Sequence, residues 1–176
     1  MKYGTAVRFM VACIVLASAS IGAVADQGPR KLKSVDDDAR QRVYVLAREG
    51  VVLLDANTRR KVAHVALPGW VWAGEKYSCP PDIALAPDGD VLVTSNVVPI
   101  IWRIEHRTLA TTLHQLTLEQ DTGRDVGFTN LRWSRQLRAF VGITDSGARW
   151  HVNRSLTRAR KVADAESGYS ARLCEG

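Results

Sequence analysis

Short runs of β-branched and aromatic residues recur along the chain, separated by turn-forming residues. Runs of about four to eight such residues, bounded by Gly, Pro, Asn or Asp, predict β-strands. The pattern predicts strands over residues 42–47, 61–67, 82–86, 90–95, 109–116, 128–133, 137–143 and 158–163, with further strands leading into Asp55, Glu105 and Asn153. The chain beyond residue 25 shows no long helical period, so the expected fold class is all-β.

The strands fall into units that repeat along the chain. Asp55, Glu105 and Asn153 mark equivalent positions, with separations of 105 − 55 = 50 and 153 − 105 = 48 residues. Three residues before each of them stands an apolar residue, namely Val52, Trp102 and Trp150. Because the two tryptophans share this register, we expect both to fill the core between units.

The second unit shows all four of its strands, with a tight turn at Pro87-Asp88-Gly89, where the Asp-Gly pair suits a hairpin. The first unit lacks a clear first strand, because residues 31–41 are mostly charged. We therefore expect residues 26–41 to form a flexible lead-in. Residues 116–124 are expected to link the second and third units.

A four-stranded meander that repeats at this period is typical of β-propeller blades. Residues 42–62 and 81–93 resemble the blades of the YVTN, NHL and lactonase-like (gluconolactonase-like) propeller superfamily. The resemblance implies a partial or small β-propeller of about three four-stranded antiparallel blades over residues 42–176. Such blades occur in enzymes and in binding proteins alike, so the resemblance leaves the function open.

Gluconolactonase-like propellers, by this resemblance, hold a divalent metal on the central axis through acidic and asparagine side chains. The matching positions of this chain offer Asp82 and Asn96, while Pro81 stands where an asparagine would be expected. Oxygen ligands suit calcium or magnesium, but two such side chains are fewer than these ions usually need. We expect no cofactor, and a metal-dependent hydrolase or isomerase is kept as an alternative function.

No other catalytic pattern stands out. The four histidines have no short metal-ligand spacing, and no serine lies in a G-x-S-x-G motif. The sequence therefore favours a protein without enzymatic activity.

The loop at residues 68–78 is rich in aromatic residues. Trp70 and Trp72 lie two positions apart between glycines, and Tyr77 follows. Such a loop either folds over the end of the sheets as a plug or forms a recognition surface. These three residues are the candidate ligand-binding residues.

Residues 1–25 have the features of a cleavable secretory signal peptide. Lys2 and Arg8 are followed by a largely apolar segment, and Ala23-Val24-Ala25 gives the small residues that a signal peptidase accepts. An uncleaved anchor is the alternative, but a spanning helix needs about 20 strongly apolar residues. We expect a periplasmic or secreted protein that retains no stable membrane span after cleavage.

Cleavage changes both the charge and the cysteine count. Loss of Lys2 and Arg8 leaves 24 − 2 = 22 basic residues against 18 acidic ones, a net charge of +4. A basic surface attracts anionic partners, although export disfavours nucleic acid. Cys79 and Cys174 are then the two remaining cysteines, and an oxidising compartment favours a disulfide between them over two buried thiols.

About three blades leave two open ends, while closed propellers have about four to eight blades. We expect a monomer in which the tail at residues 169–173 adds a strand beside residues 42–47, with Cys174 bonded to Cys79. A homodimer that closes a six-bladed ring is the alternative. The function expected is that of an exported binding or scaffolding module for an unknown protein or small-molecule ligand of the cell envelope, and a degenerate propeller fragment is a further alternative.

The signal-peptide hypothesis predicts that the exported protein begins at Asp26, because cleavage follows the small-x-small pattern at residues 23–25. Mass spectrometry of the protein recovered from the envelope fraction checks this. An intact chain that still begins at Met1 would contradict it.

Overall fold

The computed structural model describes residues 31–74, 79–119 and 127–164, which form three β-sheets. Sheet 1 contains β1 (Lys31–Asp37), β2 (Arg42–Ala47), β3 (Gly50–Asp55) and β4 (Lys61–Val65). Sheet 2 contains β5 (Ile83–Leu85), β6 (Val91–Thr94), β7 (Ile100–Ile104) and β8 (Thr111–Gln115). Sheet 3 contains β10 (Asn130–Ser134), β11 (Ala139–Ile143), β12 (Arg149–Val152), β13 (Arg158–Ala163) and β9 (Thr117–Glu119).

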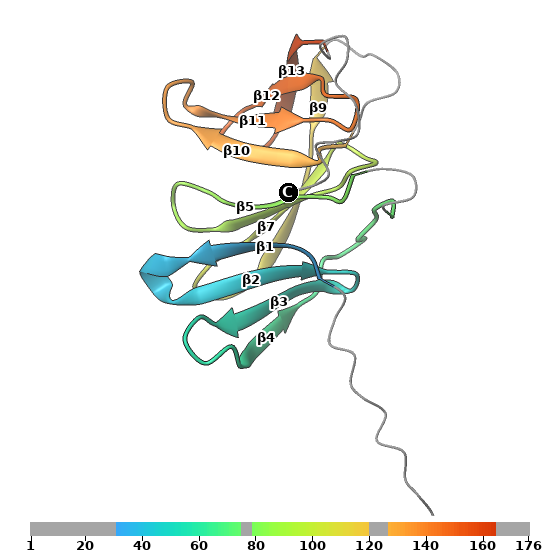
Figure 1. Cartoon of the computed structure of the whole chain (residues 1–176). Helices are drawn as coiled ribbons and strands as arrows, with labels where there is room; N and C mark the ends of the chain where they lie inside the picture. Colours follow the sequence, from blue (N-terminus) through green and yellow to red (C-terminus); the bar gives the residue numbers. More distant parts are fainter. Residues whose placement is uncertain (1–30, 75–78, 120–126, 165–176) are drawn as a thin grey trace, which may run out of the picture.

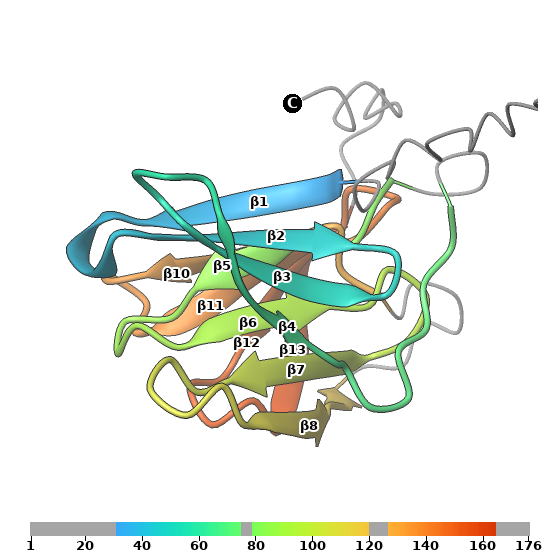
Figure 2. The same ribbon diagram turned by 90° about the horizontal axis from the view of Figure 1, so that it is seen from below.

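The three sheets are stacked, with sheet 2 between the other two (Figure 1). The four strands of sheets 1 and 2, and β10 to β13 of sheet 3, pair antiparallel in chain order, as in a meander. A single 3-10 turn at Asp38–Arg40 is the helical element of the described residues. Figure 2 views the stack from the side of sheet 1. The all-β prediction is confirmed, and each predicted repeat unit corresponds to one sheet.

The residues that mark the repeat close the turn after the third strand of each unit. Each side chain accepts a hydrogen bond from a backbone amide a few residues ahead: Asp55 from Thr58 (2.7 Å), Glu105 from Thr108 (3.3 Å) and Asn153 from Thr157 (2.8 Å). Side chains of this kind stabilise turns by satisfying backbone donors. The repeat seen in the sequence is therefore a repeat of turn chemistry as well as of strands.

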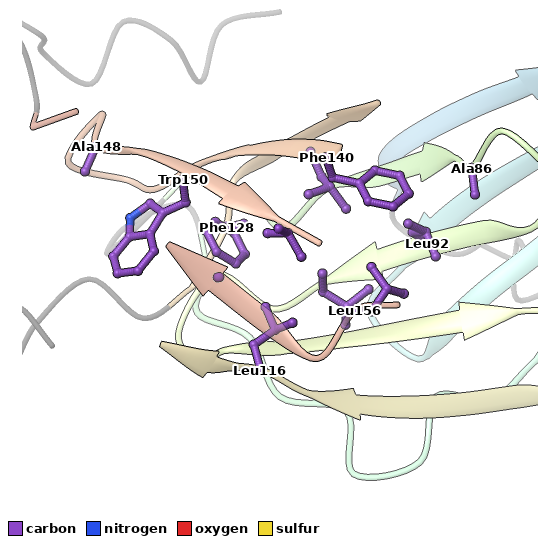
Figure 3. Packing of buried hydrophobic residues seen from close by; sticks show 12 residues of the cluster. Ala86, Leu92, Leu116, Phe128, Phe140, Ala148, Trp150 and Leu156 are labelled. Atoms are coloured by element: carbon purple, nitrogen blue, oxygen red, sulfur yellow. The ribbon is translucent and has the colours of Figure 1, made fainter. Parts of the chain in front are cut away.

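Two apolar layers hold the stack together, one on either side of sheet 2. Trp102 lies in the layer between sheets 1 and 2, and Trp150 lies in the layer between sheets 2 and 3. Both are fully buried, as predicted for core residues. Figure 3 shows the second layer, in which Trp150 contacts Phe128 edge to face, with ring centroids 6.4 Å apart.

The expected flexible lead-in is wrong for residues 31–37, which form β1 and pair with β2. The sequence did not predict this strand, because most of its residues are charged or polar. Leu32 and Val35 pack against the first apolar layer, and Lys33 forms an ion pair with Asp82. The pairing also corrects the expected place of the tail. The edge of β2 that residues 169–173 were to occupy is taken by β1, and the tail itself lies outside the described residues.

The expected linker at residues 116–124 is also wrong in part, because Thr117–Glu119 forms β9. This strand pairs in parallel with β13, and Leu118 packs against the second apolar layer. A three-residue parallel strand leaves little pattern in a sequence, because its partner lies about 40 residues later along the chain. β13 is thus covered on its outer edge by β9.

The assignment of β1 predicts unequal effects of a new charge at two neighbouring positions. Val35 faces the apolar layer, whereas Ser34 is exposed on the opposite face. Val35→Asp should lower the free energy of unfolding by about 2 kcal/mol, because it places a carboxylate against apolar side chains. Ser34→Asp, the matched control, should change it by less than about 0.5 kcal/mol when the protein is dilute enough to be monomeric. Urea unfolding followed by tryptophan fluorescence measures both, and equal effects would refute the strand assignment.

Candidate functional site

The aromatic loop begins as part of the core. The Trp70 indole contacts Trp102 edge to face, with centroids 5.1 Å apart, and its Nε1 donates a hydrogen bond to the Arg48 carbonyl (2.9 Å). Trp72 is half-buried, and Tyr77 lies outside the described residues. Trp70 thus fits the plug interpretation of this loop, while ligand binding by Trp72 and Tyr77 stays a prediction.

Asn96 and Ser95 tie this loop to the end of β6. The Asn96 side chain accepts a hydrogen bond from the Ala73 amide (2.9 Å) and donates to the carbonyl oxygens of Ala73 (2.9 Å) and Cys79 (2.7 Å). The Ser95 hydroxyl donates to the Val71 carbonyl (2.8 Å). Asn96 is buried and uses both ends of its amide to hold backbone, which explains an asparagine at this position without a metal.

Asp82 joins all three sheets. Its Oδ1 accepts a hydrogen bond from Lys33 Nζ of β1 (3.0 Å), and its Oδ2 accepts one from the Leu131 amide of β10 (2.7 Å). Lys33 also donates to the Thr129 carbonyl (2.7 Å), and the Thr94 hydroxyl donates to the Phe128 carbonyl (2.6 Å). Asp82 is buried, so these bonds connect the first strands of three repeat units.

The structure does not bring the two predicted metal ligands into a ligand cluster. Among the described residues there is no group of three His, Cys, Asp or Glu side chains placed to hold a metal ion. Each carboxylate oxygen of Asp82 already has a protein donor, and Asn96 binds the loop. A metal at these residues stays a prediction. The disulfide between Cys79 and Cys174 also stays a prediction, because Cys174 lies outside the described residues.

A charged cluster that the sequence analysis missed joins two turns of sheet 2. Asp90 accepts hydrogen bonds from Arg103 Nε (2.7 Å) and the His106 amide (3.1 Å), and its Oδ1 lies 2.7 Å from His106 Nδ1. Burial alone would raise the pKa of Asp90, but the hydrogen bonds from His106 and Arg103 outweigh burial and lower it. These bonds hold the turn that contains His106 against the turn that precedes β6.

The open face of sheet 3, which points away from sheet 2, carries a pocket of about 450 Å³. Its lining is polar and mostly basic or hydroxyl-bearing: Glu119, Ala139, His151, Asn153, Ser155, Thr157, Arg158 and Arg160. Strand alternation produces this surface, because Ala159 points into the core while Arg158 and Arg160 are exposed on the other side. The pairing register places Arg160 beside His151 on one side and beside Glu119 on the other.

Two guanidinium groups give this pocket its chemistry. In the part of the chain that the structure describes, neither Arg158 nor Arg160 forms an ion pair. Alternate residues of a strand lie about 7 Å apart on one face, so the two groups can approach one anion from two sides. The Ser155 and Thr157 hydroxyls, which are hydrogen-bonded to each other (3.1 Å), lie at the same rim. The pocket is therefore suited to a carboxylate, sulfate or phosphate group.

Comparison with known proteins gives a likeness of fold. No protein-family model and no curated protein matches the sequence. A solved structure of Kuenenia stuttgartiensis hydrazine synthase is similar over 82% of this chain, with 13% sequence identity and a TM-score of 0.56. The match covers 39% of the hydrazine synthase chain, and at this identity it concerns the fold alone.

The described residues also include no helix with the length and apolar character needed to cross a membrane.

The contacts of Asp82 predict a structural cost for its removal. Asp82→Ala should lower the free energy of unfolding by about 2–4 kcal/mol, because the buried Leu131 amide loses its acceptor and the Lys33 ammonium loses its ion-pair partner, keeping only the Thr129 carbonyl. Asp38→Ala, which removes an exposed carboxylate, is the matched control and should have little effect. Denaturant unfolding with and without calcium measures the free energy of unfolding of both variants and any stabilisation by the metal. A variant as stable as the control, or calcium stabilisation that only native Asp82 confers, would contradict this structural role.

Proposed function

We propose that this chain is an exported, propeller-like binding module that holds an anionic ligand on the open face of sheet 3 and catalyses no reaction. The observation that carries the proposal is the pocket at Arg158 and Arg160, where two exposed guanidinium groups stand without an ion pair among the described residues. Positive charge of this kind on one face draws anionic partners by long-range attraction.

The shape and lining of the pocket favour an extended anionic polymer over a small enclosed substrate. The pocket is a shallow depression on a sheet face, with hydroxyl and amide groups at Ser155, Thr157 and Asn153 beside the arginines. Acidic polysaccharides present carboxylate or sulfate groups together with many hydroxyls, which are complementary to this mixture of donors and acceptors. In the cell envelope, an acidic polysaccharide is therefore the ligand class that we propose.

The proposal predicts that the arginine pair controls binding. Arg158→Glu with Arg160→Glu should weaken the binding of polygalacturonate to the mature protein by at least about tenfold, because attraction is replaced by repulsion at the pocket. Binding of the native protein should also fall as salt rises, since exposed charges are screened. Isothermal titration calorimetry at two salt concentrations measures both effects.

A second double variant controls for net charge. Arg48→Glu with Arg135→Glu makes the same change of charge at exposed positions that do not line the pocket. It should retain binding to within about threefold. Equal losses of polygalacturonate binding in the two double variants would show a non-specific charge effect and overturn the pocket as the site. Neutral dextran should bind neither to the native protein nor to the variants.

A further inference from the structure

The pairing register shows which positions of the three sheets are equivalent. In the second and third strands of each unit, Val45 pairs with Val52, Val93 with Trp102, and Gly142 with Trp150. Two residues away, the corresponding pairs are Val43 with Leu54, Val91 with Ile104, and Phe140 with Val152. Each sheet therefore has a set of four equivalent positions on the same face.

In sheets 2 and 3 this face packs against the preceding sheet. The set in sheet 2 lies in the apolar layer with sheet 1, and Phe140, Trp150 and Val152 lie in the layer with sheet 2. The set in sheet 1 is apolar too, although no described sheet precedes it: its members are Val43, Val45, Val52 and Leu54. Val45 and Leu54 are partly exposed, whereas Val43 and Val52 are buried, with exposed fractions of 4% and 5%.

The first strands differ at the two open ends of the stack. On the face toward the preceding sheet, the equivalent first-strand residues are Asp36, Leu85 and Trp133, opposite Val43, Val91 and Phe140. On the face toward the following sheet they are Val35, Ala84 and Arg132, opposite Tyr44, Leu92 and Val141. Charge thus replaces an apolar residue only at the ends, where the acid Asp36 and the base Arg132 are both exposed.

We propose that two copies of this chain close head to tail, with the open face of sheet 1 of each copy packed on the open face of sheet 3 of the other. The result is a ring of six sheets with two-fold symmetry, within the range of about four to eight blades found in closed propellers. Val141 and Ile143 of sheet 3, both half-buried, would meet the apolar set of sheet 1. Asp36 and Arg132 occupy corresponding first-strand positions on the two faces, so their opposite charges would meet across the interface.

The anion pocket lies near the outer strands of the proposed interface. Lys61 at the outer strand of sheet 1 would approach Arg158 and Arg160 of the second copy, so an anion in the pocket would lie between cations of both chains. In the ring this face of sheet 3 is covered, so the polymer would reach the arginines from the outer edge of the interface. Asp36 and Arg132 do not line the pocket, and their exchange tests assembly without removing the arginine pair.

Charge reversal tests the ring. Sedimentation equilibrium of the mature protein should show a dimer, and Asp36→Arg or Arg132→Asp alone should each weaken dimerisation by at least about tenfold, because each places like charges together. The double variant Asp36→Arg with Arg132→Asp should restore the dimer to within about threefold, because the pair is re-formed with its signs exchanged. Far-UV circular dichroism and the melting temperature of each variant check that it folds.

Three results would overturn the proposal. A native protein that stays monomeric at about 100 µM, some hundredfold above the dissociation constant of a micromolar complex, would show that this face is covered within its own chain. A dimer weakened at Asp36 but indifferent to Arg132 would show that two copies of sheet 1 pack face to face. Single reversals that weaken the dimer without rescue in the double variant would show that the two residues do not meet. The matched control Arg135→Asp, at an exposed turn, should leave the dimer unchanged.

Discussion

The Asp82 carboxylate is the group on which the arrangement of the three sheets depends. It is bonded to Lys33 of sheet 1 and to the Leu131 amide of sheet 3, although it belongs to the segment that enters sheet 2. A buried carboxylate must find donors, since an unpaired one is costly. Here the donors lie 49 residues away in each direction along the sequence, so satisfying one side chain fixes the first strands of all three units against each other.

Once those strands are fixed, the two apolar layers follow from alternation. Trp102 and its cross-strand partner Val93 share the face of sheet 2 that packs on sheet 1. The next residue, Ile101, points to the opposite face and lies in the layer with sheet 3. The same alternation leaves Arg158 and Arg160 on the open face of sheet 3, where the anion pocket forms. The pocket is thus a consequence of having no following sheet in the described residues, and the two ends of the stack differ in character: sheet 1 presents valines and a leucine, and sheet 3 presents arginines.

The sequence was most informative where a strand carries its own pattern. Residues 42–47 and 158–163 were expected as strands and form β2 and β13 with the same bounds. β1 was missed because it is rich in charged residues and the sequence does not show that Lys33 pairs with Asp82, and β9 was missed because its three residues depend on β13. The Asp90 cluster was missed for a similar reason: His106 and Arg103 reach Asp90 across a hairpin whose register the sequence does not state. The loop tryptophans were found, but only the contact with Trp102 shows that Trp70 serves the core.

The central claim is that the three sheets form one cooperative unit tied together through their first strands, and native-state hydrogen exchange tests it most directly. Amides of β2, β6 and β11, the second strand of each sheet, should exchange through one common opening with the same free energy, because the unfolding of either outer sheet removes an apolar layer of sheet 2 and a hydrogen-bond donor of Asp82. Amides of β11 that exchange through an opening several kcal/mol less costly than that of β2 and β6 would contradict the claim, because sheet 3 would then unfold on its own.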